Sequence, residues 1–135
     1  MAIIDLKSER KLLLVEDEPA ISELLEVRLT SLGFRVYQAS NEGEALHLAR
    51  AYSPHLVLSD TRLKSYFGPR MIPDLREQGY QGLVYSMSMD PEAEIADNWL
   101  EAGAKRYFPK KNLLADAREA AGLIRGDLES SGRKY

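Results

Sequence analysis

The sequence predicts a single α/β domain built around a doubly wound parallel sheet. Short apolar runs alternate with amphipathic segments from one end of the chain to the other, which is typical of repeated β-α units. The runs are continuously apolar, as strands covered on both faces are. A length of 135 residues with 44% hydrophobic content suits one compact core.

Five short runs are the predicted strands, and each ends at a polar or turn-forming residue. They are residues 12–15, 35–39, 55–59, 83–87 and 106–108. The first stops at an acidic run that begins with Glu16, and the third ends on Asp60. These strand ends are the first places to look for function.

Five helices are predicted between and after these strands. They cover residues 19–32, 41–51, 69–77 and 91–102, and a last one is capped by Asn112 and buries Ala117, Ala120, Ala121, Ile124 and Leu128. Pro19 suits a first helical turn, and Gly33 suits a helix stop. Asn41 with Glu44 resembles a capping box. Pro73 is expected to kink or shorten the third helix.

Composition excludes several classes of protein. A net charge of -3 and a pI near 5.5 argue against direct nucleic-acid binding. No cysteine is present, so thiolate metal sites and disulfides are excluded. No signal peptide or membrane span is recognisable, which predicts a cytoplasmic protein. The expected organisation is an N-terminal extension over 1–10, a domain over 11–129 and a tail over 130–135.

Three acids should converge at one edge of the sheet. Right-handed crossovers bring the carboxyl ends of all strands to the same edge, and in the order 2-1-3-4-5 the winding reverses between strands one and three. Glu16, Asp17 and Asp60 follow these two strands. Clustered carboxylates repel one another unless protonated or bound to a hard cation, and Mg²⁺ suits such oxygen ligands. Helix capping by the acidic run is the simpler alternative, but it does not explain Asp60.

The same edge carries groups suited to phosphoryl transfer. An aspartate beside Mg²⁺ can form an aspartyl phosphate, which needs further positive charge on the phosphate. Lys110, after the fifth strand, can supply this charge, and Ser88, after the fourth, offers a hydroxyl. Each residue alone is unremarkable. Together they favour a phosphoacceptor site.

These motifs resemble the receiver domain of two-component response regulators, which has a flavodoxin-like fold. Residues 13–19 resemble the acidic-pair motif of the family, residues 56–60 its phosphoacceptor strand, and residues 102–110 its fifth-strand motif. Gly68 matches a family glycine. The resemblance covers nearly the whole chain, from about residue 11 to about residue 128.

The resemblance implies a role for each of these residues. Asp60 would accept the phosphoryl group, and Mg²⁺ would be bound by Glu16, Asp17, Asp60 and the main-chain carbonyl of Arg62. Lys110 would sense the phosphate, and Tyr107 would act as the aromatic switch. Ungapped counting places the switch hydroxyl on Ser88, with Ser86 as the rival.

The resemblance also implies partners. They are a sensor histidine kinase or phosphotransfer protein, and a downstream protein or an output domain outside this chain. A homodimer is possible, whereas direct contact with nucleic acid or with a membrane is not expected.

The sequence departs from the family pattern near the site. Lys111 replaces the proline that usually follows the lysine, and Pro109 stands one residue before it. Lys64 occupies a position where proline is common, and Met89 one where a small residue is usual. We expect Met89 to narrow access to Asp60.

Three other functions compete with a phosphoacceptor role. A receiver-like interaction module could work without phosphorylation and need not bind Mg²⁺. A magnesium-dependent phosphatase would carry a second acid two residues after the nucleophile, where this chain has Arg62. A flavodoxin-like cofactor domain would need a phosphate-binding loop after strand one, and the acidic run there would repel phosphate.

Overall fold

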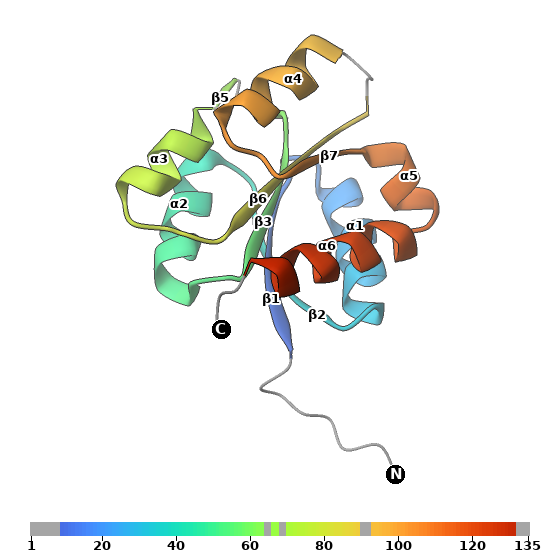
Figure 1. Cartoon of the computed structure of the whole chain (residues 1–135). Helices are drawn as coiled ribbons and strands as arrows, with labels where there is room; N and C mark the ends of the chain where they lie inside the picture. The colour runs from blue at the N-terminus through green and yellow to red at the C-terminus, as the bar shows by residue number, and fades with distance from the viewer. Residues whose placement is uncertain (1–8, 64–65, 68–69, 90–92, 132–135) are drawn as a thin grey trace.

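A computed structural model describes residues 9–63, 66–67, 70–89 and 93–131. Five parallel strands form its main sheet, in the order β2-β1-β3-β6-β7, which is the predicted 2-1-3-4-5 winding (Figure 1). These strands are β1 (Arg10–Val15), β2 (Phe34–Ala39), β3 (Leu56–Asp60), β6 (Leu83–Ser88) and β7 (Arg106–Pro109). The described residues contain six helices: α1 (Pro19–Ser31), α2 (Glu42–Tyr52), α3 (Met71–Glu77), α4 (Ala93–Ala102), α5 (Lys110–Ala115) and α6 (Arg118–Ser130). The doubly wound fold is confirmed.

Helices cover both faces of the sheet, which explains the continuously apolar strands. Along β1, Leu12 and Leu14 pack into one core with α1, α5 and α6. Leu13 and Val15 point to the other face and pack with α2, α3 and α4. All four side chains are fully buried. Each face of the sheet therefore needs apolar side chains.

The strand register brings the predicted site to one edge. Val15 pairs with Ser59, so the residues after Val15 lie beside the end of β3. Asp60 pairs with Met87, and Ser88 pairs with Pro109. Glu16, Asp60, Ser88 and Lys110 therefore all lie at the carboxyl ends of the strands.

Most helix signals act as the sequence predicts. The side chain of Asn41 accepts a hydrogen bond from the Glu44 N–H at 2.8 Å, and the Glu44 carboxylate accepts one from Ser40 N–H at 3.3 Å. Gly33 follows α1 with a φ of +95°, a conformation that glycine adopts without strain. Pro73 is the third residue of α3, where its missing N–H costs no helical hydrogen bond, so the expected kink is not needed. The expected starts at Pro69 and Pro91, and the Gly68 match, lie outside the described residues.

The last predicted helix is wrong in its start and in its continuity. Asn112 lies inside α5 and caps nothing, because α5 already begins at Lys110. The chain is extended at Asp116, whose side chain accepts a hydrogen bond from the N–H of Arg118 at 3.0 Å, and Arg118 is the first residue of α6. The expected five helices are therefore six. The predicted inward face of the last segment is confirmed, since Ala117, Ala120, Ala121, Ile124 and Leu128 are buried.

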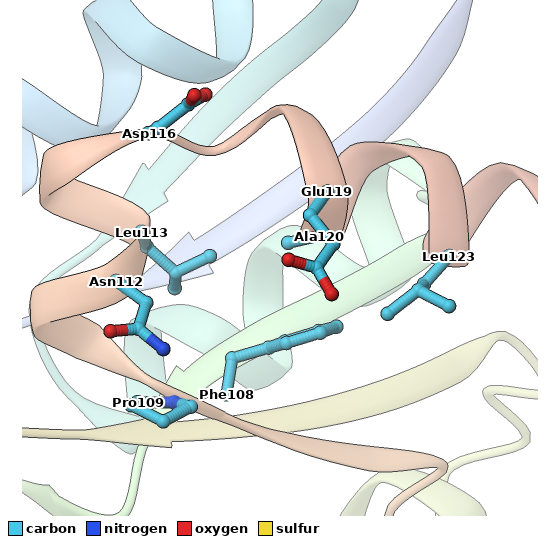
Figure 2. A pocket seen from close by; sticks show the side chains of 8 residues that line it. All are labelled: Phe108, Pro109, Asn112, Leu113, Asp116, Glu119, Ala120 and Leu123. Carbon is cyan, nitrogen blue, oxygen red and sulfur yellow. The ribbon is translucent and has the colours of Figure 1, made fainter.

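The break between α5 and α6 leaves a pocket over the end of β7. Figure 2 shows the Phe108 ring and Pro109 at one side of it, with Leu113 and Asn112 from α5. A second feature that the sequence did not predict is a short antiparallel pair after Asp60, β4 (Arg62–Leu63) with β5 (Tyr66–Phe67). Among the described residues, no helix is both long and apolar enough to cross a membrane.

Candidate phosphoacceptor site

Three carboxylates meet where β1 and β3 end. Glu16, Asp17 and Asp60 each offer an oxygen, and these oxygens all lie within 4.8 Å of one another. Glu16 is 2% exposed, whereas Asp17 and Asp60 are half-buried. Backbone contacts fix the loop, because Glu16 N–H donates to Ala39 O and the Glu16 carboxylate accepts from Glu18 N–H. This donor set fits a hard divalent cation such as Mg²⁺.

Lys110 reaches this cluster from the first residue of α5. Its Nζ lies 2.5 Å from Glu16 Oε1 and 2.9 Å from Asp60 Oδ2. The Lys110 side chain is only 4% exposed. A buried ammonium paired with two carboxylates keeps most of its charge interaction, because little water screens it. The family departures on either side of Lys110 have not displaced it: Pro109 ends β7, and Lys111 continues α5.

The pKa values of Glu16 and Lys110 are both raised. Burial raises the pKa of Glu16 above its usual value, although the contact with Lys110 acts in the opposite direction. Burial alone would lower the pKa of Lys110, but its hydrogen bonds and ion pairs with Glu16 and Asp60 outweigh burial and raise the pKa. Lys110 is therefore charged at neutral pH.

Ser88 and Tyr107 lie side by side next to the acids. Ser88 Oγ is 2.7 Å from Tyr107 Oη, and Ser88 lines the same pocket as Asp60. Ser86 is fully buried within β6. Its hydroxyl has no hydrogen-bond partner among the described residues. The geometry therefore favours Ser88 over Ser86 as the hydroxyl available to a group on Asp60.

An open pocket leads from solvent to Asp60. The residues that line it are Glu18, Asp60, Thr61, Arg62, Ser88, Met89, Ile95 and Lys110. Arg62 N–H donates to Asp60 Oδ1 at 3.2 Å, which orients the carboxylate. Met89 is 47% exposed at the rim, where the sequence predicts that it narrows access.

Sequence reasoning missed a partly buried polar network that joins α6 to the sheet. Asp127 on α6 is 8% exposed and accepts two hydrogen bonds from Arg106 on β7, at 2.7 and 2.9 Å. It also accepts one from the buried Tyr85 hydroxyl at 2.8 Å. The Arg106 hydrogen bonds hold the pKa of Asp127 below its usual value. The network ties α6 to the two strands that carry Ser88 and Tyr107, and no local sequence signal identifies it.

Comparison with known proteins agrees with this geometry. Residues 12–121 match the model of the response regulator receiver domain. The chain is 32% identical over 122 residues to the transcriptional regulatory protein AfsQ1 of Streptomyces coelicolor, covering 89% of this chain and 54% of that protein. It is 34% identical over 125 residues to the probable transcriptional regulator ycf27 of Porphyra purpurea, covering 88% and 49%.

A solved structure of a response regulator is also similar to this chain. The two-component response regulator of the LuxR family from Aurantimonas sp. SI85-9A1 is 27% identical, with a TM-score of 0.75 over 94% of this chain and 89% of that one. The chain therefore belongs to the response regulator receiver domain family. It spans about half the length of the curated relatives that it matches.

Proposed function

We propose that this domain is switched by phosphorylation of Asp60, with a phosphohistidine of a sensor histidine kinase or phosphotransfer protein as donor. The observation that carries the proposal is the convergence of three carboxylates at one edge of the sheet, with a buried lysine paired to Asp60 in an open pocket. An acidic pair beside a strand-end aspartate suits a metal, and the lysine suits a phosphoryl oxygen.

In the transfer, a carboxylate oxygen of Asp60 attacks the phosphorus atom. A P–O bond forms as the P–N bond to the donor histidine breaks, and the imidazole leaves as a neutral ring after taking a proton. Lys110 Nζ, already 2.9 Å from Asp60 Oδ2, donates to a phosphoryl oxygen and offsets the added negative charge. Ser88 Oγ donates to another phosphoryl oxygen. Water later attacks the phosphorus atom of the acyl phosphate, which releases inorganic phosphate and returns Asp60 to its carboxylate form.

Glu16, Asp17, Asp60 and the Arg62 main-chain carbonyl would hold Mg²⁺. When bound, this ion supplies positive charge that lets an anionic phosphoryl group approach three carboxylates. The same acidic residues argue against a flavodoxin-like cofactor domain, because their carboxylates would repel the phosphate of a bound cofactor.

The signal would pass through Ser88 and Tyr107. Ser88 Oγ lies 2.7 Å from Tyr107 Oη and is hydrogen-bonded to it. A phosphoryl group on Asp60 would compete with Tyr107 for this Ser88 hydroxyl. Loss of that hydrogen bond frees the Tyr107 ring to reorient and changes the surface of α4, β7 and α6. A downstream protein, an output domain outside this chain or a second copy would read this surface.

Beryllium fluoride with Mg²⁺, which mimics an aspartyl phosphate, tests the proposal. We expect saturable binding by the wild-type chain, followed by NMR, and none by Asp60→Asn. Asp97→Asn, which changes an exposed aspartate on α4, is the matched control and should bind normally. A wild-type chain that binds Mg²⁺ but no beryllium fluoride would instead support an interaction module that works without phosphorylation.

A further inference from the structure

A pocket lies where α5 and α6 separate above the end of β7, and the proposed phosphoryl transfer does not use it. Helix α5 ends at Ala115, the chain is extended at Asp116, and α6 begins only at Arg118. The side chain that α6 brings to the back of this pocket is that of Ala120, which is too short to fill it (Figure 2). The break between the helices and this small residue together leave a hollow of about 160 Å³.

The floor of the pocket is apolar. Phe108 is 8% exposed, Leu113 2% and Ala120 6%, and the more exposed Leu123 forms part of the rim. A cavity of about 150 Å³ lined by such side chains binds benzene from water. The pocket is therefore large enough to take one aromatic ring, and burial of a phenylalanine side chain contributes about 1.5 to 3 kcal/mol.

The rim of the pocket carries one negative charge that nothing nearby offsets. The residues that line the pocket include two carboxylates and no lysine or arginine. Asp116 is paired with Arg118 at 2.7 Å, whereas the Glu119 carboxylate has no ion-pair partner among the described residues. Figure 2 shows this carboxylate beside the Phe108 ring. A cation next to the buried ring of a ligand would therefore be attracted to the rim.

The pocket lies on the other face of the sheet from the Ser88–Tyr107 pair. Side chains alternate along β7, so Phe108 packs on the face that α6 covers and Tyr107 points to the face that α4 covers. The exposed Asn112 amide on the pocket wall can both donate and accept a hydrogen bond, which suits the main chain of a peptide. Phosphate groups of a nucleic acid would be repelled by the acidic rim.

We propose that this pocket docks a partner protein through a phenylalanine side chain that is flanked by a lysine or arginine. The ring enters the hollow above Phe108 and Leu113. The flanking cation pairs with Glu119, and the Asn112 amide bonds to the main chain of the docked segment. An aromatic anchor in a desolvated pocket, surrounded by a polar rim, is typical of the contacts that dominate binding between proteins. Docking here goes beyond the proposed function, because it does not require phosphorylation of Asp60.

Titration with N-acetyl-lysyl-phenylalanyl-lysine amide, followed by amide NMR of the full chain, tests the proposal. We expect saturable shifts at Asn112, Leu113, Glu119 and Leu123. The analogue with serine in place of phenylalanine should cause none, because it has no ring to bury. The analogue with glutamates in place of both lysines should bind roughly three- to tenfold more weakly, because Glu119 repels it.

Variants of the chain test the same contacts from the other side. Ala120→Met fills the hollow and should abolish the shifts, whereas Ala115→Met adds the same side chain at an exposed position outside the pocket and should bind normally. Glu119→Gln should weaken binding roughly two- to fivefold, and Glu129→Gln, at an exposed position near the end of α6, should not. Leu123→Ser changes only the exposed rim and should also weaken binding, so it tests the pocket even if Ala120→Met does not fold.

Several outcomes would overturn the proposal. They are absence of saturable shifts, equal binding of the phenylalanine and serine peptides, and unchanged binding by Ala120→Met and Leu123→Ser. Dimerisation of the wild-type chain in analytical ultracentrifugation, abolished by Ala120→Met, would assign the pocket to a second copy of the chain instead. All of these variants should bind beryllium fluoride normally, so a failed pocket leaves the phosphoacceptor proposal standing.

Discussion

Replacing Lys110 with methionine tests the centre of the site, because the two side chains have similar length and only one is charged. The lysine ammonium is the cation that pairs Glu16 and Asp60. The Glu16 side chain is 0% exposed and the Asp60 side chain 13%, so water cannot replace the lost partner at Glu16. Leaving one partner of a buried pair uncompensated costs about 3 to 5 kcal/mol. Because Glu16 can take up a proton, we expect a loss of about 2 to 4 kcal/mol in the free energy of unfolding.

Urea denaturation at pH 7 in the presence of EDTA measures this loss. Lys111→Met is the matched control: Lys111 is the next residue and is exposed, so its change should lie within about 0.5 kcal/mol of wild type. Added Mg²⁺ should restore stability to Lys110→Met more than to wild type, since a bound cation offsets the unpaired carboxylates.

The same variant should bind beryllium fluoride roughly ten- to a hundredfold more weakly, which is the loss expected for one charge-assisted hydrogen bond. Equal stability of Lys110→Met and Lys111→Met would refute the buried ion-pair argument. Unchanged beryllium fluoride affinity would refute the role of Lys110 at the phosphoryl group. The two outcomes are independent.

Three further variants test the metal, the pH dependence and the missed network. Asp17→Asn should weaken Mg²⁺ binding at least several-fold in calorimetry while leaving the chain folded or slightly more stable, because one of three mutually repelling carboxylates is removed. Burial, aided by the nearby charges of Arg10 and Lys11, lowers the pKa of His55 to about 4. Because the unfolded chain then binds a proton more readily than the folded one, the contribution of His55 to the free energy of unfolding is full above pH 6.5. It falls by up to about 3 kcal/mol as the pH drops toward 4. His55→Asn should flatten that slope in urea melts, and an unchanged slope would contradict the assignment. Tyr85→Phe removes a 2.8 Å hydrogen bond to buried Asp127 and should lower the free energy of unfolding by about 1 to 2 kcal/mol, whereas Tyr52→Phe at an exposed position should not.

The positions of the acids could be predicted because they depend on local patterns. The apolar run before Glu16 and the one before Asp60 read as strands without any knowledge of their neighbours. Once both are strands of one doubly wound sheet, right-handed crossovers place their carboxyl ends at the same edge. Strand order, the Asn41 cap and the acidic cluster thus followed from sequence, and the structure confirms the strand order and this cap.

The last helix shows where local patterns fail. Asn112 is a good cap residue, but Lys110 is drawn to Glu16 and Asp60, so α5 begins at the strand exit instead. Arg28 of α1 then holds the end of α5 by donating to Leu114 O at 2.6 Å. Contacts between residues far apart in the sequence outweigh the cap preference, which is worth only about 1 kcal/mol.

By itself, then, the sequence determined the fold class, the strands and the acids at their ends, because hydrophobic periodicity and turn residues act over a few neighbouring positions. Only the tertiary structure decided which atoms meet. Lys110 contacts both acids, Ser88 contacts Tyr107, and Tyr85 and Arg106 share Asp127, across separations of 19 to 94 residues. The physical reason is that such contacts depend on strand register and helix packing together, which no short stretch of sequence contains.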